Sequence, residues 1–135
     1  MSHPSIIMVF GTFDVLHPGH IDFFVQAKEL GDRLVVVVAR DSNVTKIKGR
    51  PPRHTEDERL RDVKAIALVD EAVLGSETDP YTVIETYRPA TIALGYDQSH
   101  AFVDHLQKEL TRRNLHPRVI RLAAYHPDKY KSSKL

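Results

Sequence analysis

Uninterrupted apolar runs alternate along this chain with stretches in which apolar residues recur at helical spacing. Residues 6–10 and 34–39 are apolar without polar alternation, which is typical of strands buried on both faces of a parallel sheet. Shorter, mostly apolar runs at 71–75, 91–94 and 119–122 predict three more strands. Strands that alternate with helices favour an α/β fold: an open parallel sheet of about five strands with helices on both faces.

The stretches between the strands predict helices over 18–30, 55–68, 79–88 and 102–113. The second of these opens with Thr55 and Glu58, whose spacing matches a capping box. The segment from Ser42 to Thr55 is polar and contains proline, which predicts a loop. The first helix is expected to bury one apolar stripe, formed by Ile21, Phe24, Val25 and Leu30.

The composition describes an ordinary globular chain. Its 135 residues predict a single domain over 1–135, and 41% of them are hydrophobic. A net charge of +1 gives no global case for binding nucleic acid or a membrane surface. There is no cysteine, so disulfides and thiolate catalysis are excluded. No signal peptide and no apolar run long enough to span a bilayer are visible, which predicts a cytoplasmic protein.

The turn between the first strand and the first helix carries the candidate chemistry. Pro18 suits the first turn of a helix, and the free N–H groups of a helix start attract anions, phosphate above all. His17 and His20 are three residues apart, so both can donate hydrogen bonds to one phosphoryl group. Two other interpretations exist: a simple turn with surface histidines, or a paired-histidine metal site. The second has no carboxylate or cysteine nearby at the usual ligand spacing, so no protein metal site is predicted.

Two further groups follow strand ends at the same predicted edge of the sheet. Between Ser42 and Thr55 the chain carries four cations and no acid: Lys46, Lys48, Arg50 and Arg53. Such a cluster is often only a solvated face, but beside a phosphate-binding turn it supplies countercharge. Asp97 follows the fourth strand, where it either stabilises a turn or contacts a ligand. Neither a G-x-G-x-x-G motif nor a Walker lysine is present, which argues against a dinucleotide cofactor and a P-loop kinase.

The ten residues from Gly11 to His20 read GTFDVLHPGH and closely resemble the signature of the cytidylyltransferase-like nucleotidyltransferases. The resemblance implies a Rossmann-like domain that transfers a nucleotidyl group from a nucleoside triphosphate to a phosphorylated acceptor and releases pyrophosphate. It implies catalytic roles for His17, His20 and Lys46. It also implies nucleotide contacts from Thr12, Phe13, His17, Pro18, Gly19, His20, Asp97, Tyr125, Ser132 and Ser133. Contacts to the acceptor or its phosphate would come from Asp14, Lys46 and Arg59.

Within that family, residues 38–41, 46–50 and 94–98 resemble the archaeal FAD synthases, which transfer AMP from ATP to FMN. Glycerol-3-phosphate cytidylyltransferase, which uses CTP, shares the same motifs and is the alternative. A nucleotide-binding regulatory module without turnover is the non-enzyme alternative, and the intact His17, His20 and Lys46 favour the enzyme. Pyrophosphate release would distinguish the two.

Three further expectations follow from the same resemblance. A divalent ion, expected to be Mg²⁺, is bound mainly through the triphosphate oxygens. The protein is expected to form a homodimer. The serine-containing stretch from Lys131 to Lys134 resembles the family's triphosphate-binding motif. In the family another helix usually follows this motif, so the resemblance implies that the C-terminal end of the domain is incomplete in this sequence.

Overall fold

The computed structural model describes residues 5–79 and 81–124. Strands and helices alternate through this part of the chain in the order β1 (Ile6–Gly11), α1 (Pro18–Lys28), β2 (Arg33–Val38), α2 (Asp41–Lys48), α3 (Glu56–Lys64), β3 (Glu71–Leu74), α4 (Thr82–Tyr87), β4 (Thr91–Leu94), α5 (His100–Arg112) and β5 (Arg118–Arg121). None of the helices in the described part of the chain is both long and apolar enough to cross a membrane.

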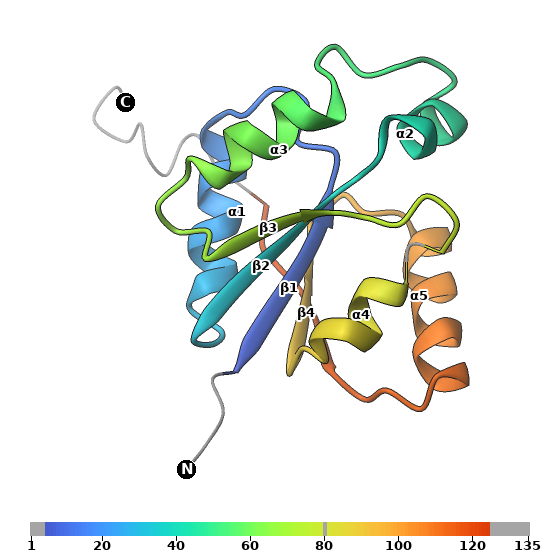
Figure 1. The fold of residues 1–135 in the computed structure, drawn as a ribbon. Coiled ribbons are helices and arrows are strands. Elements are labelled where there is room, and N and C mark those ends of the chain that lie inside the picture. Colours follow the sequence, from blue (N-terminus) through green and yellow to red (C-terminus); the bar gives the residue numbers. More distant parts are fainter. Residues whose placement is uncertain (1–4, 80, 125–135) are drawn as a thin grey trace.

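All five strands pair in parallel, in the order β3-β2-β1-β4-β5. The predicted parallel α/β sheet is therefore confirmed (Figure 1). The chain builds outward from β1 to β3 and then returns to place β4 on the other side of β1. The direction in which successive strands are added to the sheet thus reverses between β1 and β4, although all strands run parallel. In open α/β sheets, ligands bind at such a switch point, beyond the carboxyl ends of the strands.

Helices cover both faces of the sheet, and each face has its own core (Figure 1). On one face, α1 and α3 bury Phe24, Ala27 and Val63 against the strands. On the other face, α4 and α5 bury a second set: Val83, Ile84, Leu106 and Leu110. Five consecutive residues of β2, from Leu34 to Val38, are almost fully buried, as their uninterrupted apolar run predicts.

The predicted loop from Ser42 to Thr55 was wrong over its first half. Residues Asp41–Lys48 form α2, which begins with an acid and ends at Gly49 in the left-handed conformation (φ 77°). Both features suit a helix, because an acid favours the positive N-terminus and glycine ends helices at positive φ. Only Val44 of α2 is buried. The helix therefore has no apolar stripe by which sequence periodicity could reveal it.

The apolar stripe predicted for α1 is only partly correct. Phe24 is fully buried, whereas Ile21 and Val25 are 39% and 40% exposed. Ala27 takes the buried position instead, because a small residue lets the helix approach the sheet closely. The capping box at Thr55 and Glu58 is confirmed, although α3 ends at Lys64, four residues before the predicted end.

Candidate active site

Two turns meet at the switch point of the sheet: the turn between β1 and α1 that leads into His17 and His20, called the histidine turn below, and the turn after β4. Residues 12–17 connect β1 to α1, and residues 95–98 follow β4. The Gln98 side-chain amide lies 3.5 Å from the carbonyl oxygen of Phe10 in β1, so the second turn is tied to the first strand. The sequence prediction that these two segments share one edge is therefore confirmed.

The two histidines of the turn cap α1 themselves. The Gly19 backbone N–H donates to Nδ1 of His17 at 3.0 Å, and the His17 backbone N–H donates to Nδ1 of His20 at 3.3 Å. His17 is the N-cap residue and His20 is the third residue of the helix, so two imidazoles form the capping box that Ser or Thr with Glu usually forms. Each Nδ1 accepts a hydrogen bond and carries no proton. In its neutral form each ring therefore keeps its proton on Nε2, available to a ligand.

Stacking fixes the two rings relative to each other and to the core. The centroids of His17 and His20 are 4.0 Å apart, and the Phe13 ring meets His20 edge-on with a centroid distance of 5.5 Å. Burial first, and then the neighbouring His17 ring, lower the pKa of His20 to about 4, although Asp97 acts in the opposite direction. His20 is thus uncharged at neutral pH before any anion arrives.

This lowered pKa gives a stability prediction. In the unfolded chain the pKa of His20 is near its ordinary 6.5, whereas the folded value is about 4. Between these values the unfolded state binds a proton that the folded state does not, so the free energy of unfolding falls as the pH drops from 6.5 towards 4. The effect should be measurable by urea unfolding at several pH values, with His20→Gln as the reference because glutamine also suits this capping position.

We expect the wild type to lose more stability than His20→Gln across that pH window. Above pH 6.5 the difference between the two proteins should be constant. Parallel curves from pH 8 to pH 4.5 would show that the folded protein does not hold His20 in its neutral form.

Phe13 has a strained backbone, and the absence of a side chain at Gly11 leaves room for its ring. Phe13 has φ 53° and is 5% exposed, and a left-handed non-glycine residue costs on the order of 1–3 kcal/mol. Its ring lies over Gly11, where an added Cβ would come within 2.6 Å of the ring. The ring also packs on Phe24, with a centroid distance of 5.3 Å. The predicted nucleotide contact of Phe13 can therefore involve its backbone, while its side chain supports His20.

Asp14 holds the turn to the chain before α3. Its two carboxylate oxygens accept hydrogen bonds from the backbone N–H groups of Arg53 and His54, at 2.7 and 2.8 Å. Partial burial raises the pKa of Asp14, but these N–H donors outweigh it, so the pKa is lowered overall. Asp14 thus anchors the turn between β1 and α1 to the segment before α3. Its contact to the acceptor or its phosphate stays a prediction.

Arg59 is fully buried beneath the turn, with no exposed surface. Its guanidinium donates to the carbonyl oxygens of Thr12 and His54, at 2.8 and 3.1 Å, and to the carboxylate of Asp41 at 2.7 Å. The predicted phosphate contact of Arg59 does not fit this placement, because a group without exposed surface cannot reach a ligand. Arg59 instead joins the start of its own helix, α3, to two segments that precede it by many residues: the histidine turn and the start of α2.

The helix that carries Lys46 is attached to the protein mainly by polar contacts. Glu56 accepts from the Arg40 guanidinium and from the Asp41 backbone N–H, both at 2.8 Å. Lys46 itself is exposed. Figure 1 shows α2 at the edge where the strands end, the same edge as the histidine turn. The structure thus leaves Lys46 free to contact a ligand there.

A residue that sequence reasoning missed closes the second turn. Arg121, the last residue of β5, donates from Nη1 to the carbonyl oxygens of Gly95, Tyr96 and Gln98, at 2.8, 3.0 and 3.1 Å. Its position just before the carboxyl end of a predicted strand was the only signal in the sequence. Asp97 is exposed in this turn, and its carboxylate raises the pKa of His20, so it lies near the histidines. Its contact with the nucleotide stays a prediction.

Comparison with known proteins agrees with this geometry. A family model described as cytidylyltransferase-like matches residues 8–135. The chain belongs to the cytidylyltransferase-like family. It is 50% identical over 117 residues to an FAD synthase of Methanosarcina barkeri, covering 86% of this chain and 81% of the relative. It is 48% identical over 130 residues to an FAD synthase of Methanothrix thermoacetophila, covering 95% and 87%.

A solved structure supports the same fold assignment. The protein from Thermoplasma volcanium described as a lipopolysaccharide core biosynthesis protein is 36% identical and superposes with a TM-score of 0.84, covering 92% of this chain and all of that one. The cytidylyltransferase-like assignment thus rests on sequence and structure together.

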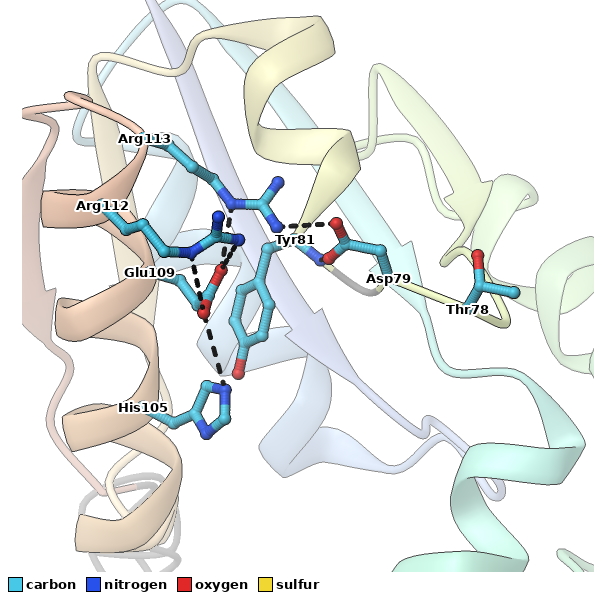
Figure 2. Close-up of a pocket in the computed structure, with 7 residues that line it drawn as sticks. All are labelled: Thr78, Asp79, Tyr81, His105, Glu109, Arg112 and Arg113. Carbon is cyan, nitrogen blue, oxygen red and sulfur yellow. Dashed lines mark hydrogen bonds and ion pairs between the residues drawn. The ribbon is translucent and has the colours of Figure 1, made fainter.

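This cytidylyltransferase-like protein also has a cleft of about 460 Å³ between α5 and the loop before α4 (Figure 2). Its charged residues are paired with one another: Arg113 contacts Asp79 at 2.6 Å and Glu109 at 3.1 Å, and Arg112 contacts Glu109 at 2.8 Å. The ring of His105 stacks on Tyr81. None of the predicted site residues lines this cleft, and its internal pairing leaves little charge to attract a substrate.

Two predictions about ligands concern a metal site and the C-terminal residues. Within the described ranges 5–79 and 81–124, no three His, Cys, Asp or Glu residues are grouped as a metal site. The predicted nucleotide contacts of Tyr125, Ser132 and Ser133 lie outside the described residues.

Proposed function

We propose that this protein is an FAD synthase, which transfers AMP from ATP to FMN and releases pyrophosphate. The observation that carries the proposal is the pair of self-capping histidines at the start of α1. Their Nδ1 atoms are occupied by backbone N–H groups, so two Nε2–H donors are available beside a helix N-terminus. The relatives named FAD synthase, at 48–50% identity over most of the chain, support this choice of substrates.

The proposed reaction needs no general base. The phosphate of FMN is mostly dianionic at neutral pH, since its second pKa is about 6, and is itself the nucleophile. One of its oxygens forms a bond to the α-phosphorus of ATP while the bond between that phosphorus and the bridging oxygen of the β-phosphate breaks. Pyrophosphate leaves with the electron pair of the broken bond. The protein has to align the two phosphates and stabilise the charge that develops.

Each residue of the site then has a defined task. The Nε2–H groups of His17 and His20 donate to oxygens of the reacting phosphate, whose negative charge grows in the transition state. Backbone N–H groups at Thr12 and Phe13 contribute to phosphate binding. The Gly19 N–H is already donated to Nδ1 of His17, so the proposed contact of Gly19 would use its close backbone approach and not that N–H. The remaining contacts are a cation for the phosphates, from Lys46, and a nucleotide contact from Asp97.

A divalent ion belongs to this proposal as part of the substrate. Mg²⁺ is proposed to arrive with ATP, held by triphosphate oxygens, because Mg²⁺ usually binds through substrate phosphates and one or two carboxylates. The dimeric state and the cytoplasmic location also remain proposals. Sedimentation velocity at micromolar protein tests the dimer, and a single species of about 15.4 kDa would contradict it.

Pairing each acceptor with each nucleotide tests the function. FMN and glycerol 3-phosphate are each combined with ATP and with CTP, and pyrophosphate release is followed. We expect turnover with FMN and ATP. Robust turnover only with glycerol 3-phosphate and CTP would instead support the cytidylyltransferase alternative, which the identity to FAD synthases does not favour. Nucleotide binding without pyrophosphate release in any combination would support a regulatory module.

A further inference from the structure

Arg121 occupies an unusual place in the turn after β4. It ends β5, an outermost strand of the sheet, and its Cα is paired in register with that of Leu94 at the end of β4. From there its Nη1 lies within hydrogen-bond distance of three backbone carbonyl oxygens, those of Gly95, Tyr96 and Gln98. One nitrogen atom of one side chain thus contacts three of the four residues of the turn.

A cation at this point has a physical reason. Three carbonyl oxygens that converge on one position repel one another, because each carries a partial negative charge. The guanidinium is permanently charged, and hydrogen bonds from charged donors are stronger than neutral ones. Tyr96 and Asp97 are both exposed, so their side chains pack little against the rest of the protein. The shape of residues 95–98 therefore depends more on the hydrogen bonds from Arg121 than on side-chain packing.

The same turn presents Asp97 to the histidine site. Gln98 holds the turn from the inside: its Oε1 accepts from the Gly95 backbone N–H at 2.9 Å, and its amide reaches β1. Arg121 holds it from the outside. Asp97 lies between these two anchors, and its carboxylate raises the pKa of His20. Without Arg121, the turn would keep its attachment to β1 but lose the contact that orders its outer carbonyl groups.

We propose that Arg121 is a positioning residue for nucleotide binding: it holds residues 95–98 in the shape that places Asp97 beside the histidine turn. This proposal rests on the proposed function, in which Asp97 contacts the nucleotide. Arg121 acts through the turn and does not itself have to touch ATP. No sequence motif includes Arg121.

The test compares Arg121→Met with Arg118→Met. Methionine keeps an apolar stem and removes the charge, and Arg118 lies at the other end of the same strand. We expect Arg121→Met to raise the KM for ATP about tenfold, the effect of losing about one charge-assisted hydrogen bond. The KM for FMN should stay within about twofold, and Arg118→Met should match the wild type. Equal increases in both KM values, or none, would overturn the proposal.

A double-variant cycle separates action through the turn from direct contact with ATP. If Arg121 works by placing Asp97, Arg121→Met should add little to the ATP KM of Asp97→Asn, because the two residues act as one unit. If Arg121 binds ATP directly, the two increases should multiply, and the positioning role would be wrong. Added guanidinium ion at millimolar concentration should partly restore Arg121→Ala, which leaves the space of the side chain empty, and should leave Asp97→Asn unchanged.

The four proteins of this cycle are the wild type, Arg121→Met, Asp97→Asn and the double variant. Their results distinguish failure of this inference from failure of the proposed function. If the wild type makes FAD and the cycle is multiplicative, only the role of Arg121 fails. If the wild type makes no FAD, calorimetric binding of ATP to the four proteins still measures the cycle without turnover. Absence of ATP binding by the wild type would overturn both proposals.

Discussion

Replacing His17 or His20 with alanine should lower kcat by about 10²–10³-fold, the range measured when one donor of an oxyanion hole is removed. The affinity for ATP should change much less, because the hydrogen bonds from Nε2 strengthen only as charge develops on the reacting phosphate. Single-turnover kinetics with ATP and FMN, together with calorimetric ATP binding, would measure the two effects separately. Near-normal kcat in either variant would show that the histidines are not part of the catalytic site.

The capping role of these histidines calls for matched controls. His17→Asn and His20→Gln keep side chains that favour the N-cap and the third helical position, so the start of α1 should survive in both. We expect them to unfold at nearly the wild-type temperature and still lose most of their activity. His116→Ala changes an exposed histidine whose ring contacts Asn114, and should leave kcat unchanged.

Replacing Arg59 with methionine should lower the free energy of unfolding by about 2–4 kcal/mol. The substitution leaves the carbonyl oxygens of Thr12 and His54 without their charged donor, and unsatisfied buried acceptors cost about 1–3 kcal/mol each. Relief from burying the guanidinium offsets part of this loss. Urea unfolding at pH 7 gives the measurement.

Arg61→Met is the control on the same helix. The Arg61 side chain is 73% exposed and contacts only Asp62 at 3.5 Å among the ion pairs of the described residues, so its loss should change stability by less than about 0.5 kcal/mol. If Arg59→Met is as stable as Arg61→Met, the contacts of Arg59 contribute nothing net. The joining role of Arg59 between the histidine turn and α2 would then be wrong.

The sheet and the histidine turn were predictable from sequence because local patterns determine them. β2 shows an uninterrupted apolar run, and the capping box of Thr55 and Glu58 is set by residues three apart. The histidine turn was recognisable because its motif occupies consecutive positions. The helix α2 was missed since it buries only Val44 and is held by Glu56 and Arg59, which follow it in the chain.

The roles of individual charged residues were harder to predict. Arg59 lies 47 positions from Thr12, and no local pattern reveals that its guanidinium reaches that carbonyl oxygen. Asp14 likewise contacts backbone groups about 40 residues away. In both cases the resemblance implied a contact with the acceptor or its phosphate, whereas the contacts in the structure join segments of the fold. Arg121 shows the reverse, since a strand-end arginine without a motif turned out to border the site.

The most direct test of the central claim follows the phosphorus atoms of ATP. In a reaction of the wild-type protein with FMN and ATP labelled with ³²P at the α-position, we expect the label to appear in FAD. With ATP labelled at the γ-position, all of the label should appear in pyrophosphate, and FAD and pyrophosphate should form in equal amounts. Transfer of the γ-label to the flavin, or failure of the α-label to enter FAD, would contradict the account.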